Sequence, residues 1–195
     1  MKPYGIVVCG GESTRMGKDK SLLTYHGMPQ YAYVAQMLKH LSESVAISCN
    51  ISQFQCEDIG YQKLYDLSEY SAHGPVSAVL TAFKHFPEND LLLVGCDYPL
   101  LAAKDLRDFL SAIEKDSLAA AFYNQHGKYE PVLAWYSRHV RPALETFCQS
   151  GEHSLQYFLN KINAQKYLPE SENCMTSVDT PEEFEKICRL LSQKH

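Results

Sequence analysis

The sequence predicts an α/β protein built as a three-layer α/β/α sandwich around a mainly parallel sheet. Short, continuous apolar runs alternate with amphipathic stretches of helical period through the first two-thirds of the chain. This alternation is typical of βαβ units, which place helices on both faces of a parallel sheet. The 195 residues suffice for one core, and no linker, repeat or low-complexity segment divides them. We therefore expect a single domain over residues 1–195.

The strand candidates are short apolar runs bounded by polar residues or glycine. A run that is apolar throughout, such as residues 5–9, suits a central parallel strand covered on both faces. Residues 90–96 form the clearest internal example and are followed by Asp97. In chain order, the predicted strands are residues 5–9, 44–49, 63–65, 90–96, 118–123 and 131–136, with a turn at 125–128 joining the last two.

The helix candidates carry apolar residues three or four positions apart, which places those residues on one helical face. The last of them also has a start signal: Thr180 is suited to the N-cap, Pro181 to the first turn and Glu183 to a capping box. In chain order, the predicted helices occupy residues 28–41, 76–83, 106–113, 140–149 and 154–161, and a final one begins at Pro181.

Composition and charge exclude several classes of protein. The net charge of −5 argues against nucleic acid and anionic membranes as partners. No apolar run reaches the length of a transmembrane helix, and the short run near the start predicts a strand rather than a signal peptide. The seven cysteines form no CxxC pair and no Cys/His cluster. These observations predict a reduced, cytoplasmic protein without zinc or a disulfide framework.

The loop after the first strand is the most informative segment. Residues 8–20 have the sequence VCGGESTRMGKDK, in which Gly10 and Gly11 precede Arg15 and Lys20. Glycines let backbone amides approach an anion closely, and fixed cations neutralise its charge. Such a loop after a first strand is typical of a phosphate-binding site, although a glycine-rich turn with solvated charges is the simpler alternative.

Polar residues that follow other predicted strands should lie near this loop, because ligands bind beyond the carboxyl ends of parallel strands. Asn50, Asp66 and Asp97 are residues of this kind. Asp97 is a candidate Mg²⁺ ligand, since this ion favours one or two carboxylates with phosphate oxygens and water, but a helix cap or turn is the alternative. Asp179 is a second, weaker candidate ligand. Together, these groups suit attack at phosphorus assisted by positioning and charge neutralisation.

Several motifs resemble those of the molybdenum cofactor guanylyltransferases (MobA type) in the nucleotidyltransferase superfamily. Residues 8–20 resemble the motif LAGGxSxRMGxDK, whereas the GxxxxGK[ST] and GxGxxG motifs do not occur. Further similar segments follow in order: residues 74–76 (GPL), 95–99 (PCDxP, with Gly95 for proline), 130–134 (PVxAL), 151–155 (GxRSL, with His153 for arginine) and 177–183 (NxNTPEE, with Ser177 and Asp179 for asparagine).

This resemblance implies a Rossmann-like fold of the nucleotide-diphospho-sugar transferase type. It implies Mg²⁺-dependent transfer of GMP from GTP to molybdopterin, with molybdopterin guanine dinucleotide and pyrophosphate as products. Arg15, Lys20 and Asp97 are the implied catalytic residues, and molybdenum-insertion proteins or molybdoenzyme chaperones are implied as further partners. The implied nucleotide-binding residues are Val8, Cys9, Gly10, Gly11, Lys20, Asn50, Asp66 and Asp97.

The resemblance assigns Glu130, Pro131, His153 and Ser154 to the pterin side of the site. The departures from the family motifs concentrate there. A protonated His153 can replace arginine at a phosphate, whereas Asp179 either adds negative charge beside a polyanion or joins Asp97 on the metal ion.

Two alternatives remain open from the sequence. One is a cytidylyltransferase acting on molybdopterin or another small phosphate, although Gly10-Gly11 favours guanine because cytidylyl relatives usually carry Ala-Gly there. The other is a non-catalytic nucleotide-binding homologue. Substitution of Asp97 distinguishes the two cases, because an enzyme would lose activity whereas a non-catalytic protein has none to lose.

Overall fold

The computed structural model describes residues 2–9, 19–50, 60–70 and 74–193. Within these residues, the strands form one seven-stranded sheet in the order β3-β2-β1-β4-β6-β5-β7. In chain order they are β1 (Tyr4–Val8), β2 (Val45–Cys49), β3 (Gln62–Tyr65), β4 (Leu91–Gly95), β5 (Ala119–Tyr123), β6 (Tyr129–Tyr136) and β7 (Gln165–Tyr167).

The register of the central strands brings their carboxyl ends level. β1 pairs in parallel with β2 and β4, so that Val8 lies opposite both Ser48 and Gly95. β6 runs antiparallel to its neighbours β4 and β5, whereas the other described pairings are parallel. The predicted hairpin is thus confirmed, and its turn lies at the same edge of the sheet as the ends of β1 and β4.

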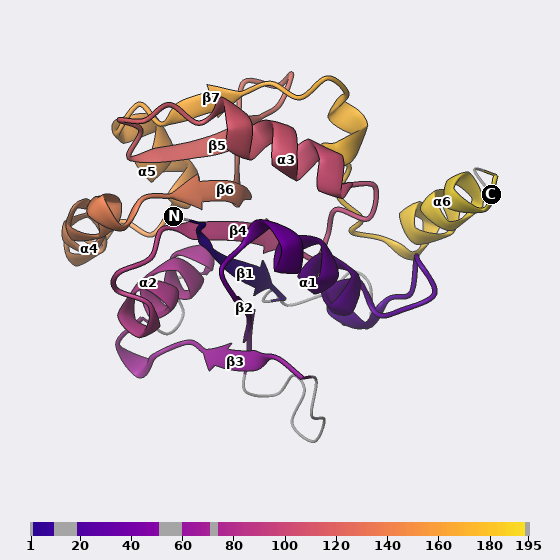
Figure 1. The fold of residues 1–195 in the computed structure, drawn as a ribbon, viewed down its shortest axis with the longest axis horizontal. Helices are drawn as coiled ribbons and strands as arrows, with labels where there is room; N and C mark the ends of the chain where they lie inside the picture. The colour runs from indigo at the N-terminus through magenta and orange to yellow at the C-terminus, as the bar shows by residue number, and fades with distance from the viewer. Residues whose placement is uncertain (1, 10–18, 51–59, 71–73, 194–195) are drawn as a thin grey trace.

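Helices cover both faces of the sheet, which gives the predicted three layers (Figure 1). α1 and α3 pack on one face, and α2, α4 and α5 pack on the other. α6 projects beyond the sheet at the right of Figure 1. The helices are α1 (Gln30–Leu41), α2 (Pro75–His85), α3 (Ala103–Ala112), α4 (Arg141–Gln149), α5 (Leu155–Lys161) and α6 (Pro181–Ser192).

Burial explains why the first strand is apolar at every position. Ile6 and Val8 of β1 face the layer of α2, whereas Val7 and Cys9 face the layer of α1 and α3. Since successive side chains of a strand point to opposite faces, a strand covered on both sides must be apolar throughout. This confirms the prediction of a central parallel strand.

The prediction missed β7, and it placed several ends one or two residues away. β7 has only three residues, Gln165–Tyr167, and two of them are polar. It is a strand because it pairs with β5, where Tyr167 packs edge-on against Phe122. Long-range pairing of this kind leaves no periodic signal in so short a segment. None of the described helices has both the length and the apolar character needed to span a membrane.

Candidate active site

A cavity of about 300 Å³ lies where β1, β2 and β4 end. The strand register brings its lining residues together, although they come from distant parts of the sequence. Gly10, Gly11 and Arg15, which were predicted for this site, lie outside the described residues. The predicted residues that line the cavity are Val8, Cys9, Lys20, Asn50, Asp66 and Asp97.

Lys20 reaches the cavity from a single turn of 3-10 helix, Lys20–Leu22. The Asp19 side chain caps this turn by accepting hydrogen bonds from the Ser21 amide at 2.9 Å and the Ser21 hydroxyl at 2.7 Å. The Lys20 ammonium forms an ion pair with the Asp179 carboxylate. The predicted phosphate-binding cation is therefore held at the cavity by a carboxylate from the other end of the chain.

Asp97 follows β4 and lies among charged groups. Burial raises the pKa of its carboxyl, and the negative charges of Asp179 and Glu130 act in the same direction. The backbone hydrogen bond that this carboxylate accepts and the Lys20 ammonium lower the same pKa. Nearby carboxylates that oppose one another's ionisation form a donor set that a hard divalent cation stabilises. Asp97, which lines the cavity, therefore fits Mg²⁺, which takes one or two protein carboxylates and completes its shell with phosphate oxygens and water. Asp179 does not line the cavity, and its carboxylate pairs with Lys20.

Gly95 creates the space that the Asp97 carboxylate occupies. A Cβ atom at this position would lie 2.5 Å from Asp97 Oδ1 and 3.2 Å from Val132 Cγ2. The first distance is too short for real atoms, so any side chain at position 95 would force the carboxylate to move. The family motif has proline at this position. The glycine of this chain leaves room for the observed orientation of the Asp97 carboxylate.

Glu130 lies near Asp97 at the start of β6, and protein donors hold both of its carboxylate oxygens. The Tyr98 hydroxyl donates to Oε2 and the Asn124 side-chain Nδ2 donates to Oε1, each at 2.8 Å. The Pro131 carbonyl, next in the chain, accepts a hydrogen bond from the Tyr136 hydroxyl at 2.9 Å. Glu130 and Pro131, which were predicted for the pterin side, do not line the cavity, whereas Val132, the next residue in the chain, does.

His153 and Ser154 do not line this cavity. The Ser154 hydroxyl is the N-cap of α5 and accepts a hydrogen bond from the Tyr157 amide at 3.2 Å. His153 immediately precedes this cap and is partly buried. The structure therefore separates these two predicted pterin-side residues from the cavity that the nucleotide-side residues line.

The N-terminus of α2 also lines the cavity, through Gly74, Pro75 and Ala78. Gly74 precedes the helix with φ +61°, a conformation that favours glycine, and Pro75 occupies the first turn. Helix N-termini attract anions through their free amides and the helix dipole. The apolar spacing of residues 76–83 predicted this helix but not its place in the site, because glycine followed by proline also marks an ordinary turn.

A C-terminal segment ties α6 to the site. The Val178 amide donates to the Asp97 carbonyl at 3.1 Å, and Asp179 follows with its ion pair to Lys20. The predicted capping box is confirmed, since the Glu183 carboxylate accepts from the Thr180 amide and the Thr180 hydroxyl accepts from the Glu183 amide.

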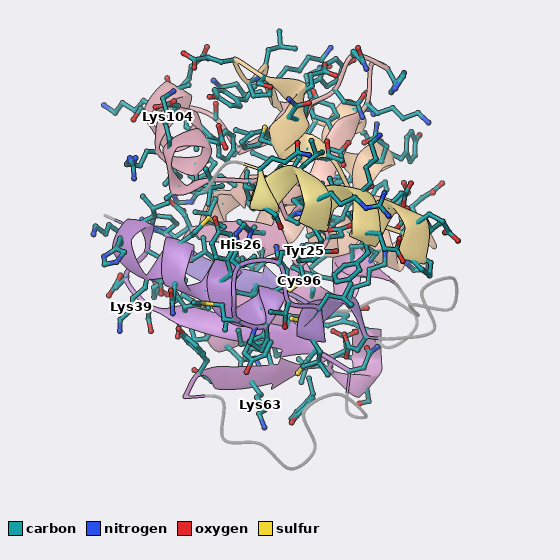
Figure 2. The ribbon with its side chains drawn as sticks, turned by 90° about the vertical axis from the view of Figure 1, so that its right-hand side faces the viewer. Tyr25, His26, Lys39, Lys63, Cys96 and Lys104 are labelled. Carbon is teal, nitrogen blue, oxygen red and sulfur yellow. The ribbon has the colours of Figure 1, made fainter. Side chains whose placement is uncertain are left out.

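Ring packing holds α6 and the loop after Lys20 together. Phe184 of α6 packs edge-on against Tyr25, with ring centroids 5.0 Å apart, and Figure 2 shows Tyr25 beside α6. The next residue, His26, lies with Nε2 2.9 Å from the Pro99 carbonyl oxygen in the loop after β4. The elements that carry Lys20, Asp97 and Asp179 are thus in mutual contact.

The sequence is similar to known proteins of one family. A family model described as the MobA-like NTP transferase domain matches residues 5–166. A molybdenum cofactor guanylyltransferase from Pseudomonas entomophila is 34% identical over 153 residues, which cover 77% of this chain and 78% of that protein. A molybdenum cofactor biosynthesis bifunctional protein from Synechocystis is 28% identical over 94% of this chain, which spans about half (53%) of that relative's length.

Solved structures show the same fold. The crystal structure of molybdopterin-guanine dinucleotide biosynthesis protein A from Archaeoglobus fulgidus superposes with a TM-score of 0.78, covering 97% of this chain and 99% of that one. The two sequences are 18% identical, so this likeness concerns the architecture alone.

Proposed function

Because the chain belongs to the MobA-like NTP transferase family and is a nucleotidyltransferase, we propose that it transfers GMP from GTP to molybdopterin and releases pyrophosphate. The observation that carries this proposal is the cavity at the ends of β1, β2 and β4, where Lys20, Asp97 and the N-terminus of α2 converge. A cation, a carboxylate and a helix N-terminus are the groups that a triphosphate requires. We place this activity in one domain over residues 1–195.

On the nucleotide side, Lys20 neutralises phosphate oxygens, and Val8, Cys9 and the following Gly10 and Gly11 present backbone to the nucleotide. Arg15 holds the phosphates with Lys20. When GTP binds, the Lys20 ammonium exchanges its Asp179 partner for phosphate. Asn50 and Asp66 line the same cavity beyond β2 and β3, where they contact the guanosine. Positioning and charge neutralisation supply most of the rate enhancement in such a site.

Asp97 is the residue we propose to hold Mg²⁺, with Asp179 beside it. When bound, this ion neutralises the phosphates and makes the attacked phosphorus more electrophilic. Asp97 is suited to this role because burial and neighbouring carboxylates already disfavour its uncompensated charge. Gly95 leaves its carboxylate free to face the cavity.

On the acceptor side, we propose that molybdopterin approaches past β6, near Glu130, Pro131 and Val132. His153 and Ser154 would contact a part of the acceptor that extends beyond the cavity. The product passes to molybdenum-insertion proteins or molybdoenzyme chaperones. A cytoplasmic location suits this role, because Cys9, Cys49 and Cys96 at the proposed site are thiols rather than disulfides.

The proposal is tested by assaying pyrophosphate release from purified protein with GTP, molybdopterin and Mg²⁺. Asp97→Asn should lower turnover by at least about 100-fold, as expected for loss of a group that stabilises transition-state charge. The matched control is Asp116→Asn, since Asp116 is an exposed aspartate outside the cavity. Full turnover by folded Asp97→Asn protein would refute the proposed role of Asp97, and faster turnover of wild type with CTP would reverse the nucleotide assignment.

A further inference from the structure

Three cysteines line the cavity at the ends of three neighbouring strands. Cys49 ends β2, Cys9 follows β1 and Cys96 follows β4. All three belong to the same buried cluster on the α1 and α3 face of the sheet. Figure 2 labels Cys96 on the side of the molecule from which α6 projects. The mechanism proposed above uses none of these thiol groups.

Cys9 and Cys96 are in direct contact. Their sulfur atoms lie 3.2 Å apart, and both side chains are buried. The two backbones are neighbours, because Val8 pairs with Gly95 and the Cys96 amide donates to the Val8 carbonyl at 3.1 Å. On the other side of β1, the Cys9 amide donates to the Ser48 carbonyl of β2 at 2.9 Å. Neighbouring strands lie about 4.8 Å apart, a separation within the Cα range that disulfides adopt.

We propose that Cys9 and Cys96 are a modification site, which a peroxide converts to a reversible disulfide across the floor of the cavity. The bridge inactivates the enzyme, a consequence that rests on the proposed function. Cys9 stands where the family motif has alanine, so this chain adds a thiol partner to the cysteine of the metal-binding motif. The two residues line an open cavity, which gives a small oxidant access to them.

The reaction is balanced by the peroxide alone. One cysteine gives up its thiol proton and its sulfur attacks a peroxide oxygen, which breaks the O–O bond. The departing hydroxide takes up that proton, so that a sulfenic acid and one water form. The sulfur of the second cysteine then attacks the sulfenic sulfur, the S–O bond breaks, and the departing hydroxyl leaves as a second water with that thiol's proton. Two thiols are thereby oxidised by two electrons while one peroxide is reduced to two waters. A cellular dithiol reverses the step by thiol–disulfide exchange.

The bridge affects catalysis through its neighbours in the chain. Disulfide formation brings the sulfur atoms from 3.2 Å to about 2.05 Å, so the ends of β1 and β4 must adjust. Gly10 follows one cysteine directly, and Asp97 follows the other. The cross-link therefore acts on the backbone next to the proposed metal ligand.

The test is oxidation of purified wild-type protein with a small excess of hydrogen peroxide, followed by non-reducing digestion and mass spectrometry. We expect a peptide pair joined through Cys9 and Cys96, two hydrogen atoms lighter than the sum of the reduced peptides. The matched control is Cys49→Ser, which removes the third thiol of the cavity and should leave the bridge intact. Cys9→Ser and Cys96→Ala should each abolish it. A bridge from Cys9 to Cys49, or none in folded wild type, would overturn the inference.

A second measurement separates this inference from the proposed function. Pyrophosphate release by wild type should fall at least about tenfold on bridging and return with dithiothreitol. Full activity of the bridged form would refute the inactivation. If the bridge forms but the fully reduced enzyme releases no pyrophosphate from GTP and molybdopterin, the proposed function fails while the modification site stands.

Discussion

Asp66 shows how the cavity changes the chemistry of one side chain. It follows β3 at the cavity and is partly buried, and this burial raises the pKa of its carboxyl above the ordinary value of 3.8. Burial disfavours the charged form because a carboxylate loses hydration that the surroundings replace incompletely. The protein thus retains at this position a charge that costs folding free energy, as expected where a side chain serves a ligand.

This cost predicts a pH dependence of stability. Between pH 3.8 and the higher pKa of the folded state, the folded protein binds more protons than the unfolded chain, so the free energy of unfolding falls as the pH rises. Asp66→Asn removes that contribution, so the free energy of unfolding of this variant should fall less steeply with pH. Urea unfolding of both proteins between about pH 4 and pH 7 measures the difference.

The control for this measurement is Asp116→Asn, which changes an exposed aspartate. Its profile should follow that of wild type. If the free energy of unfolding of Asp66→Asn changed with pH as steeply as that of wild type, Asp66 would ionise with equal ease in the folded and unfolded states.

Individual site residues were predictable where a general rule connects sequence to position. Asn50, Asp66 and Asp97 follow predicted strands, and the carboxyl ends of parallel strands meet at one edge, so their common cavity followed from the chain. The roles of these three residues in binding the nucleotide or a metal ion remain predictions. The Lys20–Asp179 pair and the Cys9–Cys96 contact were not foreseen, because they join side chains 159 and 87 positions apart. Such contacts depend on rotamers and on the packing of whole elements.

At the scale of elements, α6 matters through the turn that precedes it. Thr180 and Glu183 fix the backbone at the start of the helix, and the Asp179 amide also donates to the Glu183 carboxylate at 2.8 Å. The capping box thereby positions the residue that pairs with Lys20. This segment lies beyond residues 5–166, which the family model matches.

Thr180→Ala should therefore loosen α6 and the Asp179 side chain together. Loss of an N-cap hydroxyl costs about 1 kcal/mol, which corresponds to roughly fivefold faster local opening. Hydrogen exchange of the α6 amides measures this change. The control is Thr146→Ala, since Thr146 is exposed and its hydroxyl donates within α4 to the Pro142 carbonyl. Unchanged α6 exchange in Thr180→Ala would mean that packing of Phe184 alone holds the helix.

Whole elements were predictable in proportion to their length and periodicity. β1 and α1 were placed within two residues of their observed ends because their patterns are continuous, and the start of α6 at Pro181 was placed from its capping box. β7 was missed because three residues have no measurable period and take their conformation from β5. The hairpin of β5 and β6 was found from its turn, whereas the position of β6 between β4 and β5 followed from no local signal.

At the scale of the whole molecule, we expect the free energy of local opening to decrease from the central strands of the sheet to its edge. β4 is buried along its length, β1 is buried after Tyr4, and both are paired on two sides, whereas β7 is partly exposed and pairs on one side among the described strands. Local opening requires less free energy where fewer apolar contacts and hydrogen bonds are lost. The cavity, at the ends of β1, β2 and β4, therefore rests on the most stable part of the fold.

We accordingly expect a hierarchy in the hydrogen exchange of wild type. The amides of Ile6–Val8 and Leu92–Val94 should exchange last, and those of Gln165–Tyr167 should exchange much earlier. Mass spectrometry of peptides from a time course resolves these segments. Equal protection of β7 and β4 would indicate that the sheet opens only as one cooperative unit.

The ion pair between Lys20 and Asp179 has a consequence for how the site forms during translation. Synthesis proceeds from the N-terminus, and 159 positions separate the two partners. A chain still emerging from the ribosome can build β1, β2 and β4 and expose their cavity, yet it lacks Val178 and Asp179, which contact Asp97 and Lys20. The order of translation thus delays the contacts of Asp97 with Val178 and of Lys20 with Asp179 until residue 179 has been made.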